Sequence, residues 1–161
     1  MTPLSLQEFL SREEARAGLD PVLSRLLIGI SEACKEISAK VREGALAGVL
    51  GLAGSENVQG EEQKKLDIIS NDIFVEAVAR TGAVCGMVSE EVPEPVAVPE
   101  PLPLGPYLAC FDPLDGSSNI DINVSIGSIF SILPAPEVRR TPEAADFLQP
   151  GRNLVAAGYC M

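Results

Sequence analysis

The chain has 161 residues, of which 46% are hydrophobic and 22% charged, and its formal net charge is −11 at pH 7. This length and composition predict one globular domain, and an acidic chain without a basic stripe is a poor nucleic-acid binder. Four cysteines without a Cys-x-x-Cys pair and no histidine exclude the usual zinc sites, a Ser-His-Asp triad and a Cys-His dyad. No apolar run is long enough to span a membrane and the first residues lack a secretory signal, so we expect a cytoplasmic protein.

Helices are predicted in the first half of the chain. Thr2-Pro3 is a helix-start signal that opens a short helix, and Asp20-Pro21 repeats the signal before a long one. Apolar residues then recur at three- and four-residue spacing. The segment Gly44–Gly60 carries five glycines and no periodicity, which predicts a long mobile loop of the kind that is often functional. A third helix is predicted over about Glu62–Arg80.

The second half of the chain is predicted to form strands. A buried strand over Ala83–Ser89 is followed by Pro93–Pro106, an extended surface connection with six of the 13 prolines. A polar stretch over Pro134–Arg152 interrupts the strands that follow. These are predicted at Tyr107–Phe111, Ile120–Ser125, Ser128–Leu133 and Leu154–Tyr159. Helices first and strands later indicate an α+β layered fold.

The cysteines lie far apart in the sequence, each among apolar or small residues. We expect all of them to be reduced, buried thiols that behave as small hydrophobic side chains. They are Cys34, Cys85, Cys110 and Cys160. Without histidine and without a reactive cysteine, any hydrolytic chemistry must use carboxylates and metal ions.

The run from Phe111 to Asp121 carries the strongest functional signal. Asp112 and Asp115 follow an apolar strand, and the Leu114 carbonyl between them is a third oxygen ligand for a hard cation. Gly116-Ser117-Ser118 then offers backbone N–H groups and two hydroxyls to a phosphate. A metal ion and a phosphoryl group held side by side indicate phosphate-ester hydrolysis. The alternative is an ordinary tight turn, because Asp-Pro and Asp-Gly are common turn pairs.

A second pair of acids, Glu90-Glu91, ends the preceding strand. If the two strands are neighbours, these acids and the pair Asp112 and Asp115 gather at one end of the sheet, where they repel one another unless cations lie between them. Oxygen-only ligands favour Mg²⁺ or Mn²⁺, and two such ions can bind phosphate and activate a water. Asp67, near the start of the third helix, can join the water-activating acids. The alternative for Glu90-Glu91 is a solvated loop.

Basic residues are missing from this whole region. No Lys or Arg occurs in the 58 residues between Arg80 and Arg139. The charge of a bound phosphate must therefore be met by metal ions and backbone N–H groups. A second phosphate on the substrate needs basic residues from elsewhere.

Five sequence blocks in order resemble class I fructose-1,6-bisphosphatase, within the lithium-sensitive sugar phosphatase superfamily. The blocks are Gly54–Gly60, Gln63–Asp67 with Asn71-Asp72, Val88–Glu91, Phe111–Asp121 and Phe147–Tyr159. The resemblance implies the N-terminal half of the sugar-phosphatase fold, with helices packed on a mixed sheet. Residues 1–161 then form the metal- and phosphate-binding domain, and the second, C-terminal domain is absent.

The same resemblance assigns roles to the acidic residues and the loop. It implies hydrolysis of fructose 1,6-bisphosphate to fructose 6-phosphate and phosphate, as in gluconeogenesis or the Calvin cycle, by a cytoplasmic homo-oligomer, a tetramer in the family. The implied metal ligands for Mg²⁺, with Mn²⁺ as an alternative, are Glu90, Asp112, Asp115 and the Leu114 carbonyl. Glu91 and Asp67 help to activate water, and the implied substrate-binding residues are Asp115, Gly116, Ser117 and Ser118.

Two departures from the family pattern keep alternatives open. Family members are much longer, and their second half supplies the residues that hold the 6-phosphate, so we expect a fragment or a truncated product. The chain is then either part of the bisphosphatase, a catalytically incompetent binding module, or a phosphatase for another sugar or inositol phosphate. At positions aligned with the family's AMP site the chain reads Gly18-Leu19-Asp20-Pro21 and Pro106-Tyr107, which does not favour AMP control.

Overall fold

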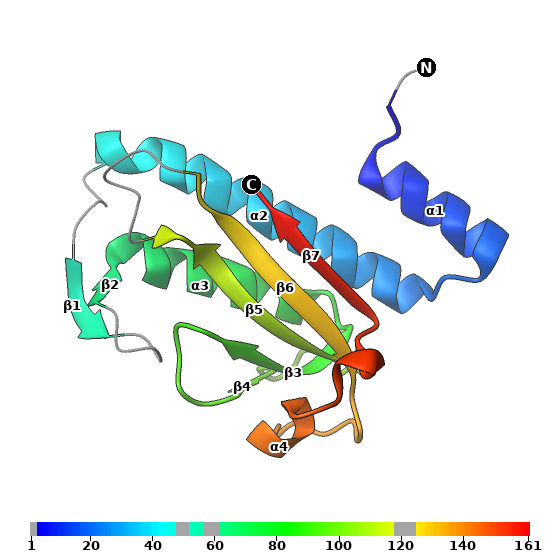
Figure 1. The fold of residues 1–161 in the computed structure, drawn as a ribbon. Coiled ribbons are helices and arrows are strands. Elements are labelled where there is room, and N and C mark those ends of the chain that lie inside the picture. Colours follow the sequence, from blue (N-terminus) through cyan, green and yellow to red (C-terminus); the bar gives the residue numbers. More distant parts are fainter. Residues whose placement is uncertain (1–2, 48–51, 57–61, 118–124) are drawn as a thin grey trace.

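The computed structural model describes residues 3–47, 52–56, 62–117 and 125–161. Helices α1–α4 and strands β1–β7 are labelled in Figure 1. In chain order the elements are α1 (Leu6–Ala17), α2 (Pro21–Ala47), β1 (Leu52–Glu56), β2 (Glu62–Lys64), α3 (Lys65–Arg80), β3 (Val84–Ser89), β4 (Val96–Ala97), β5 (Tyr107–Asp115), β6 (Gly127–Pro134), α4 (Ala144–Phe147), a 3-10 helix (Gly151–Asn153) and β7 (Ala156–Cys160).

A mixed sheet forms the centre of the molecule (Figure 1). The strand order is β4-β3-β5-β6-β7, in which β3 and β5 run parallel and the other neighbours run antiparallel. Strands β1 and β2 pair antiparallel in a separate two-stranded sheet. Because β3 and β5 are parallel, the residues that follow them in sequence leave the sheet at the same edge.

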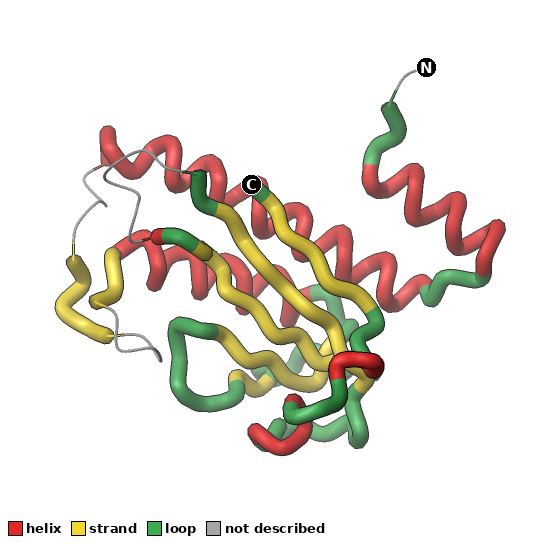
Figure 2. Tube along the Cα trace, in the orientation of Figure 1, coloured by secondary structure: helices red, strands yellow, loops and turns green. Residues whose placement is uncertain are grey.

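Helices α2 and α3 cover one face of the sheet (Figure 2). Phe74 of α3 is fully buried and stacks on Phe111 of β5, with the ring centroids 4.3 Å apart. The apolar spacing that predicts α2 supplies its side of this core, including Leu26 and Ile30, which are at most 1% exposed. The layered α+β fold with helices packed on a mixed sheet is confirmed. None of the described helices is both long and apolar enough to cross a membrane.

The helix starts are set by side-chain caps. The hydroxyl of Ser5 accepts the Glu8 N–H at 3.2 Å, and the Glu8 carboxylate accepts the Ser5 N–H at 2.9 Å. This capping box starts α1 at Leu6, so the predicted start at Thr2-Pro3 is wrong, and Thr2 itself lies outside the described residues. The predicted start at Asp20-Pro21 is confirmed, since α2 begins at Pro21 and the Asp20 Oδ1 accepts the Val22 N–H at 2.9 Å.

The loop predicted over Gly44–Gly60 is correct only in part. Helix α2 continues to Ala47, because the strong helix formers after Gly44 offset the glycine, and β1 occupies Leu52–Glu56. Residues 48–51 and 57–61 lie outside the described part of the chain. The third helix begins at Lys65 rather than at Glu62, because residues 62–64 pair with β1.

The strand predictions are largely confirmed. Strand β5 is longer than expected, because its pairing with β6 continues past Asp112 to Asp115. The connection over Pro93–Pro106 lies only partly on the surface, since it contains β4 and the 2% exposed Val98. The predicted strand over Ile120–Ser125 falls almost wholly on residues 118–124, outside the described residues.

The cysteines differ in burial according to their elements. Cys34 on α2 and Cys85 on β3 are buried as predicted, and Cys110 is half-buried. Cys160 is exposed, so the prediction of four buried cysteines is wrong there. Its strand β7 stands last in the described sheet and is covered less than the central strands.

Candidate active site

The candidate site is built on the carboxyl ends of the two parallel strands. Ser89 of β3 pairs with Phe111 of β5, and the Glu90 N–H donates to the Phe111 carbonyl at 3.1 Å. This register brings Glu90 beside Asp112. The two acids that the sequence places at the ends of different strands are therefore neighbours in the sheet.

Strand alternation directs these residues to opposite faces of the sheet. Phe111 points to the helix side, where it stacks on Phe74. Asp112 belongs to a cross-strand row with Ile129 of β6 and Tyr159 of β7, and such a row shares one face. Alternation puts that row on the face away from α2 and α3. The buried Phe111 thus anchors the strand on the helix side, while the Asp112 side chain lies on the opposite face of the sheet.

Burial and neighbouring acids change the protonation of Asp112. Burial, followed by a hydrogen bond with the Glu90 side chain, raises the pKa of Asp112 from 3.8 to about 8, against the lowering effect of the Leu114 N–H. The charges of Glu90 and Asp115 raise this pKa further. Without a cation, the Asp112–Glu90 pair therefore holds a proton near neutral pH. A cation can replace that proton.

The backbone between Asp112 and Gly116 is fixed by its own hydrogen bonds. The Asp112 Oδ1 accepts the Leu114 N–H at 2.9 Å, and the Ser128 hydroxyl donates to the Pro113 carbonyl at 2.9 Å. The Leu114 side chain is buried, 2% exposed. Gly116 follows with φ +84°, a left-handed conformation that glycine adopts without strain. The loop thus turns sharply directly after Asp115.

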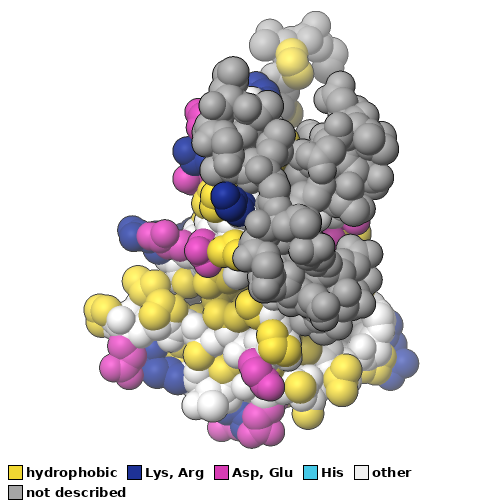
Figure 3. Space-filling model, turned by 90° about the vertical axis from the view of Figure 1, so that its left-hand side faces the viewer, with side chains coloured by type: hydrophobic (Ala, Val, Ile, Leu, Met, Phe, Trp, Pro, Cys, Tyr) yellow, Lys and Arg dark blue, Asp and Glu magenta, His cyan; other side chains and the backbone are white. Residues whose placement is uncertain are grey.

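The two predicted water-activating acids are both buried. Glu91 is 7% exposed, and its N–H donates to the Ser89 Oγ at 3.2 Å. Asp67 is 3% exposed in the first turn of α3, which begins at the end of the molecule where β3 and β5 finish (Figure 1). Asp67 comes from the helix side of the sheet and Asp112 from the other face. Figure 3 looks onto this end, where hydrophobic side chains form a patch with acidic side chains at its border.

The structure brings the predicted residues together to different degrees. Glu90 and Asp112 are in contact, and Asp115 acts on Asp112 through its charge. Within the described ranges, no three acidic, cysteine or histidine side chains lie close enough together to form a ready metal cage. Asp115, Gly116 and Ser117 are half-buried in the turn, and Ser118 lies outside the described residues.

The donor set nevertheless fits a hard divalent cation. Glu90, Asp112 and Asp115 offer carboxylate oxygens and Leu114 offers its carbonyl, and no sulfur or nitrogen ligand is among them. Such all-oxygen sets select Mg²⁺ or Mn²⁺ over zinc. The pKa of Asp112 is raised first by burial and then by the Glu90 side chain and the charges of Glu90 and Asp115, and a bound cation would oppose all of these effects.

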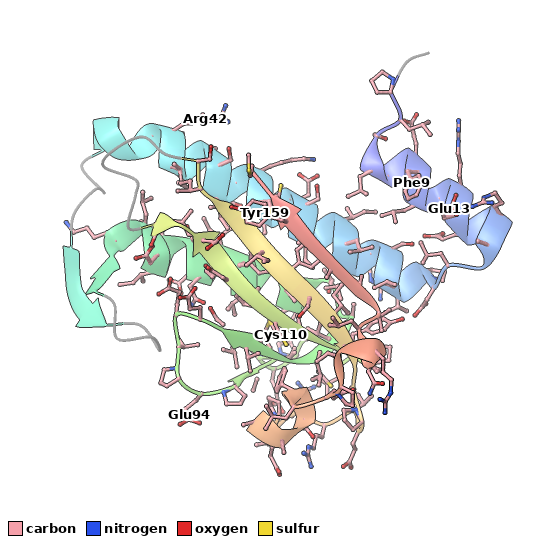
Figure 4. All side chains as sticks on the ribbon, in the orientation of Figure 1. Phe9, Glu13, Arg42, Glu94, Cys110 and Tyr159 are labelled. Atoms are coloured by element: carbon pink, nitrogen blue, oxygen red, sulfur yellow. The ribbon has the colours of Figure 1, made fainter. Side chains whose placement is uncertain are left out.

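Two further residues, Tyr159 and Ser128, lie beside the site although the sequence pattern does not predict them there. Tyr159 borders a hollow of about 570 Å³ that Asp112 also lines, and Figure 4 labels Tyr159 on β7 and Cys110 on β5. Burial, and then the charge and a hydrogen bond of Asp115, raise the pKa of Tyr159. Ser128 supports the Pro113 carbonyl. Only the pairing of β6 with its neighbours brings them here, and no local sequence signal reports it.

Comparisons with known proteins agree on one family. The family model described as "Fructose-1-6-bisphosphatase, N-terminal domain" matches residues 4–161. The chain is 55% identical over 136 residues to "Fructose-1,6-bisphosphatase class 1" of Halorhodospira halophila, covering 84% of this chain and 40% of that relative. It also matches the crystal structure of Leishmania major fructose-1,6-bisphosphatase in holo form, with a TM-score of 0.85 and 33% identity, over 99% of this chain and 49% of that one. The chain therefore spans less than half the length of either protein.

Proposed function

The chain belongs to the fructose-1,6-bisphosphatase family, and from this we propose that it is the metal- and phosphate-binding half of an enzyme that hydrolyses fructose 1,6-bisphosphate to fructose 6-phosphate and phosphate. The observation that carries the proposal is the contact between Glu90 and Asp112 at the ends of β3 and β5. Two acids are kept together there at a cost to stability, as expected for a cation site.

The proposed cation is Mg²⁺, with Mn²⁺ as the alternative. Its ligands are the carboxylates of Glu90, Asp112 and Asp115 and the carbonyl of Leu114. When bound, the ion supplies Lewis-acid activation of the phosphoryl group and of a water. The chain's own contribution is to hold Asp112 in place, through the Leu114 N–H on its Oδ1 and the buried Phe111 before it.

The proposed phosphate position follows the turn at Gly116. Backbone N–H groups of Gly116, Ser117 and Ser118 and the two hydroxyls donate to the 1-phosphate, while Asp115 orients it from the strand end. Glu91 and Asp67 accept the proton of the attacking water. Their burial supports this role, because a buried carboxylate is restricted to few orientations.

The proposal is tested by metal binding and by turnover, measured separately. Calorimetry with Mg²⁺ on the 161-residue chain should give binding that falls at least about tenfold in Asp112→Asn, and not in Asp146→Asn, which changes an acid distant in sequence. Phosphate release from fructose 1,6-bisphosphate is then measured with Mg²⁺ and with chelator. Equal Mg²⁺ binding by the chain and by Asp112→Asn would overturn the assignment.

A binding module without turnover is the second candidate. It is favoured by the 58 residues without Lys or Arg between Arg80 and Arg139, since the 6-phosphate then lacks a basic partner around the proposed site. A chimera that continues this chain with the second half of the Halorhodospira halophila relative distinguishes the two. If the chimera turns over substrate and the chain alone binds metal without turnover, then this chain supplies the metal site and the second half supplies the binding site for the 6-phosphate.

The proposed partners are a sugar bisphosphate and further copies of the chain, as a homo-oligomer, a tetramer by family resemblance, in the cytoplasm. Exposed apolar side chains support self-association, among them Phe9, Leu148 and Met161. A monomer on size-exclusion chromatography would contradict it. Asp20 and Tyr107, at the positions aligned with the family's AMP site, hydrogen-bond to each other, so AMP control is not proposed.

A further inference from the structure

Two cysteines that lie far apart in the sequence meet between α2 and the edge of the sheet. Cys34 lies in the middle of α2 and is 5% exposed, and Cys160 ends β7, the strand at the edge of the described sheet. Both line one cavity of about 260 Å³, together with Ser128 and Leu114. In Figure 1 the end of β7 lies over α2.

The strand register directs the Cys160 side chain towards α2. Cys160 pairs with Ser128 across β6 and β7, and directly paired residues point to the same face. The same face carries Ile132 of β6, which belongs to the core packed against α2 and α3. Cys34 and Cys160 therefore approach each other from the two sides of one helix–sheet contact.

The side chains also interact with each other. Burial raises the pKa of Cys34 to about 11, a hydrogen bond with Ser128 lowers it, and the charge and a hydrogen bond of Cys160 raise it. These interactions place the Cys34 thiol near both the Ser128 hydroxyl and the Cys160 thiol. The two thiols therefore face the same cavity and influence each other, and both are reduced in this structure.

The other two cysteines, Cys85 and Cys110, lie away from Cys34 and Cys160. Cys85 and Cys110 belong to a separate small cluster that also includes Leu108. The Cys85 Sγ lies 3.7 Å from the Tyr107 carbonyl, whereas Cys110 stands three residues further along β5, opposite Val88. Neither of them lines the cavity that Cys34 and Cys160 share.

We propose that Cys34 and Cys160 form a reversible intramolecular disulfide that ties β7 to α2. The inference rests on the packing of α2 against the sheet and is independent of the proposed function. The oxidant is a low-molecular-weight disulfide of the glutathione class. In the 161-residue chain Cys160 is exposed and Cys34 is buried, so Cys160 meets the oxidant first and Cys34 is the resolving thiol.

The exchange proceeds in two steps. The Cys160 thiolate attacks one sulfur of the oxidant, so that its S–S bond breaks, a mixed disulfide forms and one small thiolate leaves. Cys34 then loses its proton to solvent and attacks the Cys160 sulfur, which releases the second small thiolate. Two protein thiols are oxidised and one small disulfide is reduced to two thiols. Excess dithiothreitol reverses the reaction.

The test uses the 161-residue chain with oxidised glutathione, followed by alkylation and mass spectrometry. The expected product has the mass of a single chain less about 2 Da before alkylation, with no disulfide-linked dimer. Two of its four cysteines are then alkylated, and digestion yields a Cys34–Cys160 peptide. The variant Cys160→Ser should give no such product, whereas the matched control Cys110→Ser should give it in full. Since Cys160 is exposed, its serine variant should fold. Peptide mapping of the unmutated chain identifies the disulfide directly, whether or not a variant folds.

Thermal unfolding provides a second readout. A disulfide between residues 34 and 160 closes a long loop and so restricts the unfolded chain. The oxidised chain should therefore melt about 10 °C above the reduced one, whereas oxidised and reduced Cys160→Ser should melt at the same temperature. Four alkylated cysteines after oxidation, a disulfide between other cysteines, or a dimer joined through Cys160 would each overturn the proposal.

Discussion

Replacing Asp112 by asparagine should make the metal-free chain more stable at alkaline pH, although it removes a residue of the site. Burial and the Glu90 side chain raise the pKa of Asp112 from 3.8 to about 8. The folded chain therefore binds this proton more tightly than the unfolded chain does. The resulting stabilisation is complete below pH 3.8 and is lost as the pH rises to about 8.

The magnitude follows from the size of this pKa shift. A shift from 3.8 to about 8 corresponds to roughly 6 kcal/mol, and because Asp112 is only half-buried we retain about half of that, about 3 kcal/mol. Asparagine keeps the Oδ1 that accepts the Leu114 N–H, and its amide can donate to Glu90. At pH 8.5 the variant should melt about 5 to 10 °C above the unmutated chain.

The assay is thermal unfolding followed by circular dichroism at pH 5 and pH 8.5, each with chelator and with Mg²⁺. With chelator, the advantage of Asp112→Asn should be less than half as large at pH 5, and with Mg²⁺ only the unmutated chain should gain stability. The exposed Asp72→Asn on α3 is the control. A variant that melts below the unmutated chain at pH 8.5 with chelator, or by the same margin at both pH values, would refute the reasoning.

Two substitutions test the packing around β3 and β5. Phe74→Ala should cost about 3 to 5 kcal/mol in the free energy of unfolding, measured in urea, because it leaves a cavity behind Phe111; the half-exposed Phe9→Ala should cost under about 1 kcal/mol. Gly105→Ala should cost about 2 to 3 kcal/mol, because the added Cβ would lie 2.2 Å from the backbone carbonyl of Ala83, whereas Gly151→Ala meets no atom within 4 Å. Equal unfolding midpoints for Phe74→Ala and Phe9→Ala, or for Gly105→Ala and Gly151→Ala, would contradict the packing described.

The sequence predicts the elements of this fold better than their ends. The apolar spacing of α2 and the apolar run of β3 identify them correctly, because burial on one side is recorded in the local pattern. The ends depend on partners that a local pattern does not record. Residues 62–64 leave the third helix because they pair with β1. The start of α1 at Leu6 is an exception, because the capping box of Ser5 and Glu8 is a local signal.

The site was predictable only where its residues follow strands directly. Asp112 and Glu90 could be paired by assuming that their strands are neighbours, which the β3–β5 register confirms. Tyr159 and Ser128 could not be placed, since their position depends on how β6 and β7 align with β5. The same dependence on pairing explains why Cys160, predicted to be buried, is exposed at the edge.

The parallel register of β3 and β5 also decides which changes in chain length the protein tolerates. One residue inserted in β5 before Phe111 would turn Asp112 towards the helices, since alternate residues face opposite sides and each advances the strand by about 3.3 Å. The same insertion in the connection over 99–103 would only lengthen a surface loop, at a small entropic cost. Insertions and deletions should therefore collect in that connection and be excluded from the few residues that precede Asp112.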